Sequence, residues 1–142
     1  MKKIYITTPI FYVNDIPHIG HAYTSIICDA LCKYFKLSGF DVLFTTGTDE
    51  HGLKVEKAAK NKGMNVNDFV DLVSENFKAL TKKLQLSNTD FIRTTDSRHK
   101  NAALFFWEKL VKNDQIYLSK YKGWYSIKDE SFYQEKELEK KK

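Results

Sequence analysis

The sequence predicts an α/β fold in which parallel strands alternate with helices. Two runs rich in β-forming residues, 3–8 (KIYITT) and 40–46 (FDVLFTT), flank a helical stretch over residues 20–37. A strand, a crossover helix and a second strand of one sheet form a right-handed unit with parallel strands almost without exception. Buried parallel strands read as continuous apolar runs, as 42–44 (VLF) does. The predicted class is therefore α/β with a Rossmann-like parallel sheet.

The elements follow in order. The first strand ends at Pro9, and a loop containing Asn14, Asp15 and Pro17 leads into the first helix, which closes at residues 38–39 (SG). Its apolar residues recur at helical spacing and predict a buried face made of Ile26, Ile27, Ala30, Leu31, Tyr34 and Phe35. Cys28 and Cys32 lie four positions apart, a spacing that indicates two reduced, packed thiols.

Three more helices are expected. A polar helix runs from Gly52 to about Lys62 and stops at Gly63. The next is amphipathic, with a predicted buried side of Phe69, Val70, Leu72, Val73, Phe77, Leu80 and Leu84. Residues 91–93 (FIR) read as a short strand, and Asp96 or Ser97 caps the last helix. The core face of that helix, together with its aromatic residues, is predicted to be Leu104, Phe105, Phe106, Trp107, Leu110 and Val111.

The pattern changes near the carboxyl end. From Ile116 onwards short β segments (IYLSKYKGWYSI) replace the helices, and Gly123 marks a turn or bulge. We therefore divide the chain into residues 1–116, the α/β domain, and residues 117–142, the start of an inserted domain. The final residues (EKELEKKK) are expected to form a charged helix or a frayed tail.

Length and composition set limits on the protein class. At 142 residues with 42% hydrophobic content, one core is the default, and no run approaches the about 18 apolar residues of a membrane span. The first residues (MKKIYITTPIF) carry no signal-peptide pattern, which predicts a cytoplasmic protein. The net charge of +5 agrees with a phosphate-bearing partner, although solvated lysines explain it more simply.

The most informative run is residues 7–25 (TTPIFYVNDIPHIGHAYTS). His18, Gly20 and His21 lie where a strand gives way to a helix, and helix N-termini favour anions through free N–H groups and the helix dipole. Gly20 has no Cβ, so a nucleotide can approach the backbone. Two histidines three positions apart share one side of the first turn and can donate hydrogen bonds to phosphate oxygens. The run predicts a phosphate site.

This run resembles the HIGH signature of the class I aminoacyl-tRNA synthetases, with His18, Ile19, Gly20 and His21 in its four places. The letters before it (TTPIFYVNDIP), the later block TGTDEHG at 46–52 and the block FIRTTDSRH at 91–99 are similar to the methionine branch of that family. Agreement at several ordered blocks is far more specific than one H-x-G-H, which some nucleotidyltransferases also use.

The resemblance implies a ligase that activates methionine with ATP, accompanied by Mg²⁺, to methionyl-adenylate and then transfers it to tRNA(Met) in protein biosynthesis. It implies that His18 and His21 are catalytic and that they bind ATP together with Gly20. It further implies that Ile10, Tyr12 and Asp49 bind methionine, with Asp49 on its amino group. A carboxylate facing an ammonium is a charge-assisted pair, and an aromatic ring suits a thioether.

Simpler interpretations remain open for several of these residues. Tyr12 could be a loop aromatic that covers the sheet edge, and Asp49 could cap the helix beginning near Gly52. Asn14 fits a turn before Pro17. His51 is as compatible with a structural role as with substrate contact, and a structural role is favoured for His99.

Two features depart from the family pattern. Where many members carry zinc-binding cysteine pairs, residues 124–133 hold Ser126 and Asp129, so no structural zinc is expected. The second family signature, Lys-Met-Ser-Lys-Ser, does not occur in the 142 residues. The resemblance therefore implies an N-terminal fragment: the first half of a catalytic domain (1–116) and the start of a connective domain (117–142), inactive alone and marginally stable. The alternatives are a non-catalytic synthetase-like binding module and an H-x-G-H nucleotidyltransferase.

Overall fold

A computed structural model describes residues 2–138 of the chain. The described residues form two compact units that divide between Phe105 and Phe106. The domain boundary expected at residue 117 remains a prediction. No helix in the described range is long and apolar enough to cross a membrane.

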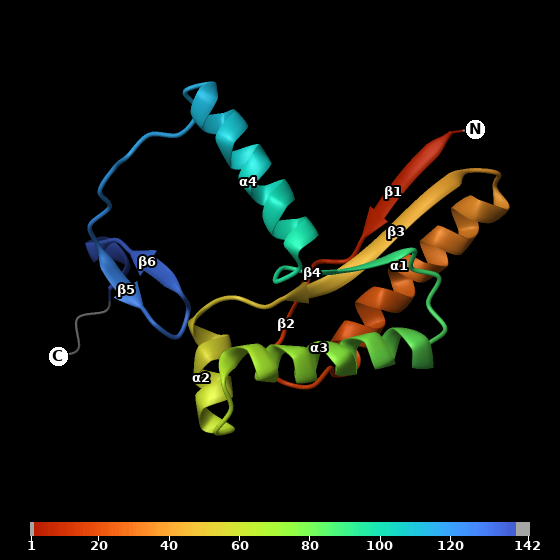
Figure 1. Ribbon diagram of the computed structural model, residues 1–142, viewed down its shortest axis with the longest axis horizontal. Coiled ribbons are helices and arrows are strands. Elements are labelled where there is room, and N and C mark those ends of the chain that lie inside the picture. Colours follow the sequence, from red (N-terminus) through yellow and green to blue (C-terminus); the bar gives the residue numbers. More distant parts are fainter. Residues whose placement is uncertain (1, 139–142) are drawn as a thin grey trace. The chain divides into compact units, whose positions relative to one another are not determined.

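The first unit is built on a parallel sheet, as predicted (Figure 1). Strand β3 (Asp41–Asp49) pairs in parallel with three others: β1 (Lys3–Thr7), β2 (Phe11–Tyr12) and β4 (Asp90–Arg93). β3 continues three residues beyond the predicted end because β2 pairs with Thr48 and Asp49 and β4 pairs with residues 45–48. The polar block that follows the apolar run is therefore itself part of the sheet.

Four helices connect the strands at the predicted places: α1 (Ile19–Leu37), α2 (Leu53–Asn61), α3 (Val66–Lys83) and α4 (Ser97–Lys112). α1 and α3 lie on the same face of the sheet (Figure 1). Val42 and Phe44 of β3 pack with Cys32 of α1, and Thr48 of β3 contacts Ser74 of α3. Because side chains alternate along a strand, the even-numbered residues of β3 face these helices and the odd-numbered ones face the opposite side.

The buried stripe of α1 differs from the predicted one. Ser25, Asp29 and Cys32 are buried, whereas five of the six residues expected there are exposed: Ile26, Ile27, Ala30, Leu31 and Tyr34. A carboxylate is tolerated in this stripe because Asp29 Oδ1 accepts hydrogen bonds from Ser87 N and Ser87 Oγ, both 2.6 Å, and Oδ2 lies 2.6 Å from Lys33 Nζ. Burial would raise the pKa of Asp29, but these hydrogen bonds outweigh it and hold the pKa below its usual range.

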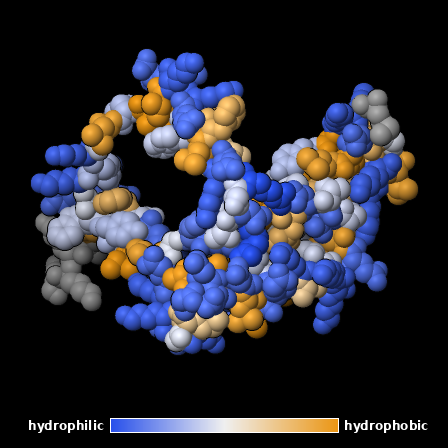
Figure 2. All heavy atoms as spheres, in the orientation of Figure 1, coloured by the Kyte–Doolittle hydropathy of each residue, from blue (hydrophilic) through white to orange (hydrophobic). Residues whose placement is uncertain are grey.

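The predicted core face of α4 is also wrong. No residue of this helix is buried. Four of its large apolar side chains are more than half exposed: Leu104, Phe105, Phe106 and Trp107. Figure 2 shows apolar atoms at the surface of this helix. The same error affects Leu72 of α3, which is exposed, while Phe69, Val70, Val73 and Phe77 form the core as expected. Helical periodicity identifies an apolar face but not whether another element covers it.

The second unit contains a short antiparallel hairpin, β5 (Trp124–Ser126) and β6 (Ser131–Tyr133), followed by the 3₁₀ turn η1 (Glu135–Glu137). The predicted change to short β segments is confirmed from Trp124 onwards, whereas residues 116–123, where it was expected to begin, form no strand. Ser126 and Asp129 make a turn, in which Ser126 Oγ donates to Asp129 Oδ2 at 2.7 Å. The last four residues of the predicted charged end, 139–142, lie outside the described range.

Candidate active site

The two histidines of the signature form a reciprocal capping box at the start of α1. His18 is the N-cap of α1, and its Nδ1 accepts a hydrogen bond from Gly20 N at 3.1 Å. His21 Nδ1 accepts one from His18 N at 3.0 Å. This reciprocal arrangement satisfies two of the unpaired donors at the helix start. Because each Nδ1 is an acceptor, each neutral ring carries its proton on Nε2, and both Nε2–H groups are available to a ligand.

Gly20 has a role in this arrangement that the sequence did not reveal. A Cβ at this position would lie 2.9 Å from His18 Cε1 and 3.1 Å from His18 Nδ1. The missing Cβ of Gly20 therefore leaves room for the His18 ring. The close approach of a nucleotide to Gly20 stays a prediction. The rings of His18 and His21 stack with their centroids 3.8 Å apart.

His21 is held by aromatic side chains from two other elements. Its ring meets Phe11 of β2 edge-on at 4.9 Å and Phe77 of α3 edge-on at 5.1 Å, and these two phenylalanines stack at 5.7 Å. Burial, and secondly the charge of His18, lowers the pKa of His21 below its ordinary value. At neutral pH His21 is accordingly a neutral Nε2–H donor with a fixed orientation.

A pH titration should show this directly. The folded chain binds a proton on His21 less tightly than the unfolded chain does. The contribution of His21 to the free energy of unfolding is therefore complete above about pH 6.5 and is lost as the pH falls from there through the lowered pKa. Imidazole ¹⁵N NMR is expected to show Nε2–H tautomers for His18 and His21 at pH 8 and titration of His21 below about pH 6.5. An Nδ1–H tautomer, or a His21 that titrates above the ordinary value, would contradict the capping geometry.

Most of the predicted site residues surround one cavity of about 430 Å³. Ile10, Tyr12, His18 and His21 all line it, together with Pro9, Phe11, Asn14, Asp15 and Ile16. Tyr12 and Ile10 remain 50% and 42% exposed, so both side chains are accessible to a ligand. The imidazole Nε2–H groups that line such a cavity can donate to phosphate oxygens, and the exposed aromatic ring can contact an apolar group.

Asp49 does not line this cavity but adjoins it through the sheet. It is in register with Tyr12, and Val13 N donates to Asp49 O at 3.4 Å. The alternative role of Asp49 as a helix cap is wrong: the N-cap of α2 is Gly52, which makes no side-chain capping bond. As an odd-numbered residue of β3, Asp49 points to the side opposite α1 and α3.

The remaining polar candidates fall in different places. Asn14 lines the same cavity as the histidines. His51 is exposed, with Nε2 3.4 Å from Thr94 O. His99 lies at the start of α4 and lines a separate cavity of about 350 Å³ that shares only Ile10 with the first.

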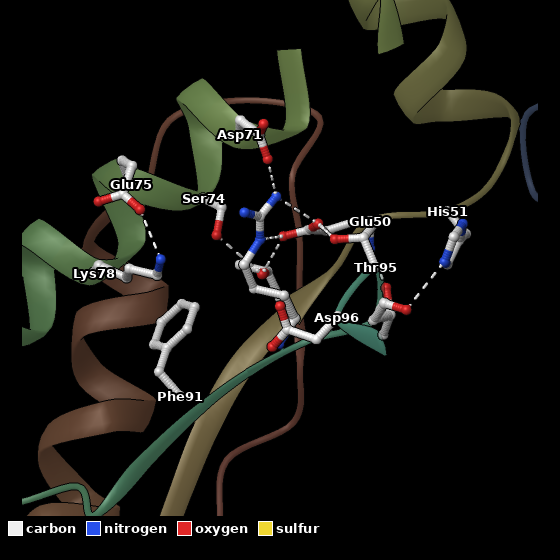
Figure 3. A network of polar contacts seen from close by, with 12 residues as sticks. Glu50, His51, Asp71, Ser74, Glu75, Lys78, Phe91, Thr95 and Asp96 are labelled. Atoms are coloured by element: carbon white, nitrogen blue, oxygen red, sulfur yellow. Dashed lines mark hydrogen bonds and ion pairs between the residues drawn. The ribbon is translucent and has the colours of Figure 1, made fainter. Parts of the chain in front are cut away.

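A buried ion pair next to Asp49 was not predicted from the sequence. Glu50 is 2% exposed and forms a bidentate salt bridge with Arg93 (Figure 3). Arg93 Nε donates to Glu50 Oε1 at 2.7 Å, and Arg93 Nη2 donates to Glu50 Oε2 at 2.9 Å. The available signal was a glutamate within two residues of a buried strand, where an unpaired charge is too costly to remain. Within the described range no group of three or more His, Cys, Asp or Glu side chains could hold a metal ion.

Comparison with known proteins adds independent findings. A family model described as "tRNA synthetases class I (M)" matches residues 4–141. The chain is 58% identical over 134 residues to a methionine--tRNA ligase of Rickettsia felis, covering 94% of this chain and 26% of the relative. It is 49% identical over 138 residues to one from Listeria monocytogenes, covering 97% and 21%. The chain thus spans about a quarter of the length of such relatives.

A solved structure agrees. Mycobacterium tuberculosis methionyl-tRNA synthetase in complex with methionyl-adenylate superposes with a TM-score of 0.90 and 44% identity, over 96% of this chain and 27% of that one. The fold of the chain is therefore that of the matching part of that protein.

Proposed function

The chain belongs to the methionine group of the class I tRNA synthetases, and on that premise we propose that it contributes to the ATP-dependent activation of methionine and its transfer to tRNA(Met). The observation that carries this proposal is the pair of Nε2–H donors at the start of α1, which line an accessible cavity. The paired ends of β2 and β3, at Tyr12 and Asp49, adjoin that cavity. The Mycobacterium tuberculosis relative binds methionyl-adenylate, the intermediate that such a site would form.

In the proposed reaction the carboxylate of methionine attacks the α-phosphorus of ATP, and pyrophosphate leaves. His18 and His21 would donate their Nε2–H groups to phosphate oxygens, where negative charge grows in the transition state. The hydrogen bonds that each Nδ1 accepts from a backbone N–H fix the ring orientations in advance, so little reorganisation is needed when the charge develops. The lowered pKa of His21 keeps its imidazole neutral at neutral pH, with the proton on Nε2.

The amino-acid side of the site would be formed by the ends of β2 and β3. The Asp49 carboxylate would bind the ammonium group of methionine, and the exposed ring of Tyr12 and the backbone of Ile10 would contact its side chain. Mg²⁺ would arrive bound to ATP, and we assign no residue of this chain to it. We propose tRNA(Met) as the macromolecular partner. We also propose that the protein acts in the cytoplasm, where protein synthesis consumes the aminoacylated tRNA.

The test is a chimaera in which this chain replaces the matching segment of the Mycobacterium tuberculosis enzyme. Methionine-dependent exchange of radiolabelled pyrophosphate into ATP is expected in the chimaera. His18→Ala and His21→Ala should each lower kcat about 100- to 1,000-fold, the usual effect of removing one transition-state hydrogen-bond donor.

His99→Ala is the matched control, because it removes a histidine that lies outside the cavity of the pair. It should change the rate by no more than about twofold. An inactive chimaera that still binds methionine would favour the non-catalytic binding module. Exchange that survives loss of both signature histidines would contradict the proposed chemistry.

A further inference from the structure

The carboxylate of Glu50 lies in a fully satisfied, buried environment immediately after the end of β3. Its Oε1 accepts from Thr48 Oγ1 at 2.7 Å and from Arg93 Nε at 2.7 Å. Its Oε2 accepts from Arg93 Nη2 at 2.9 Å and from Thr95 Oγ1 at 2.5 Å. Burial would raise the pKa of Glu50, but these bonds and the charge of Arg93 hold it below its usual range, so the group stays ionised at neutral pH.

Arg93 joins this carboxylate to two other elements. It is the last residue of β4, and its Nη2 also contacts Asp71 Oδ1 of α3 at 2.5 Å. Figure 3 shows Glu50 directed toward Asp71 and Ser74 of α3, with His51 pointing away from them. The bond to Glu50, ahead of the other contributions, raises the pKa of Arg93, so the guanidinium remains charged. The bidentate Glu50–Arg93 contact thus ties the end of β3 to β4, and the single contact of Arg93 with Asp71 extends the link to α3.

The same segment is also fixed along its backbone. Thr48 Oγ1, on one side of Asp49, lies 3.3 Å from Ser74 Oγ of α3. On the other side, Glu50 N donates to Thr94 Oγ1 at 2.9 Å. Asp49 stands between two residues whose side chains are held on the helix-covered face, so strand alternation forces its own side chain onto the opposite face.

We propose that Glu50 and Arg93 are positioning residues for the methionine site, whose salt bridge fixes the direction of the Asp49 carboxylate toward the substrate ammonium group. The inference rests on the proposed role of Asp49. A buried ion pair is a poor source of net stability, because apolar residues of similar size often do as well or better. Its four convergent donors, its planar geometry and its location one residue from Asp49 are what a positioning role requires.

The binding test compares L-methionine with its analogue that lacks the α-amino group, by calorimetry on the full 142-residue chain. The unaltered chain should prefer methionine, and Asp49→Asn should remove that preference. Glu50→Gln is expected to reduce it about tenfold, because a misdirected carboxylate loses much of a charge-assisted hydrogen bond. It should leave the affinity for the analogue unchanged. An unaltered preference in Glu50→Gln would overturn the proposal.

Asp29→Asn is the matched control. Asp29 is another buried carboxylate with several hydrogen bonds, but it lies eight residues along α1 from His21, about 12 Å away along the helix. Its substitution should lower stability without changing the preference for methionine. If Asp29→Asn lowers the preference as much as Glu50→Gln does, the effect is general destabilisation and the positioning role is wrong.

A second measurement needs no ligand. Backbone ¹⁵N order parameters at Asp49 and His51 should stand near the rigid level of about 0.85 in the unaltered chain and fall toward about 0.6 in Glu50→Gln. Unchanged values would overturn the positioning role whatever the binding data show. If instead the unaltered chain has no preference for methionine while these values fall, the methionine site assigned above is wrong and the Glu50–Arg93 pair still orders Asp49.

Discussion

Replacing Gly47 with alanine is expected to cost more than about 4 kcal/mol and to leave most of the chain unfolded. Gly47 lies within β3, where β4 pairs closely against it. A Cβ at this position would lie 2.0 Å from Ile92 O and 2.9 Å from Ile92 C, both backbone atoms of the neighbouring strand. No side-chain rotation relieves such a contact, so the two strands would have to separate. Loss of this pairing would also displace Arg93, the next residue of β4 after Ile92.

Urea unfolding followed by far-UV circular dichroism measures the effect. Gly39→Ala is the matched control: Gly39 has φ of 81°, but a Cβ there meets no atom within 4 Å. Only the left-handed backbone conformation penalises it, by about 1–2 kcal/mol. A Gly47→Ala chain that unfolds within about 1 kcal/mol of the unaltered one would contradict the close approach of the two strands.

The fold could be predicted from the sequence wherever a local pattern determines the outcome. The strand–helix–strand order follows from periodicity and chain chirality, as do the core residues Phe69 and Phe77 of α3. The first helix ends at Leu37 as predicted and begins at Ile19, one residue before the predicted start. The predictions that were wrong concerned features that depend on contacts between segments far apart in the sequence. The buried stripe of α1 contains Asp29, because Ser87, which is remote in sequence, supplies its hydrogen bonds.

In the candidate site too, the features set by local sequence could be predicted and those set by long-range contacts could not. The position of His18 and His21 at a helix start was predictable, and the shared cavity agrees with it. Their reciprocal capping was not predictable, because whether each Nδ1 accepts a hydrogen bond from the backbone N–H groups of the helix start depends on ring orientation. Glu50 and Arg93 are 43 residues apart, and only the register of β3 with β4 brings them together. A lone sequence contains no record of that register.

Phe77→Ala is expected to lower the free energy of unfolding by about 3–5 kcal/mol, the usual result of removing a buried phenylalanine ring. Phe77 is 2% exposed, belongs to the larger core cluster and stacks on Phe11. Because its ring also covers His21, the substitution should reach the site: less burial of the imidazole should bring the pKa of His21 back up toward its ordinary value. Urea unfolding and the imidazole NMR titration measure the two effects on one sample.

Phe69→Ala separates these two effects. Phe69 belongs to the same core cluster and is 4% exposed, but none of the ring contacts of His21 in the described residues involves it. It should lose a similar amount of stability while the pKa of His21 stays where it is. If both variants move that pKa equally, the imidazole responds to loosening of the core as a whole. If only Phe77→Ala moves it, one side chain of α3 couples the packing of the core to the protonation of a proposed catalytic donor, and substitutions at Phe77 alter the site even where the fold survives.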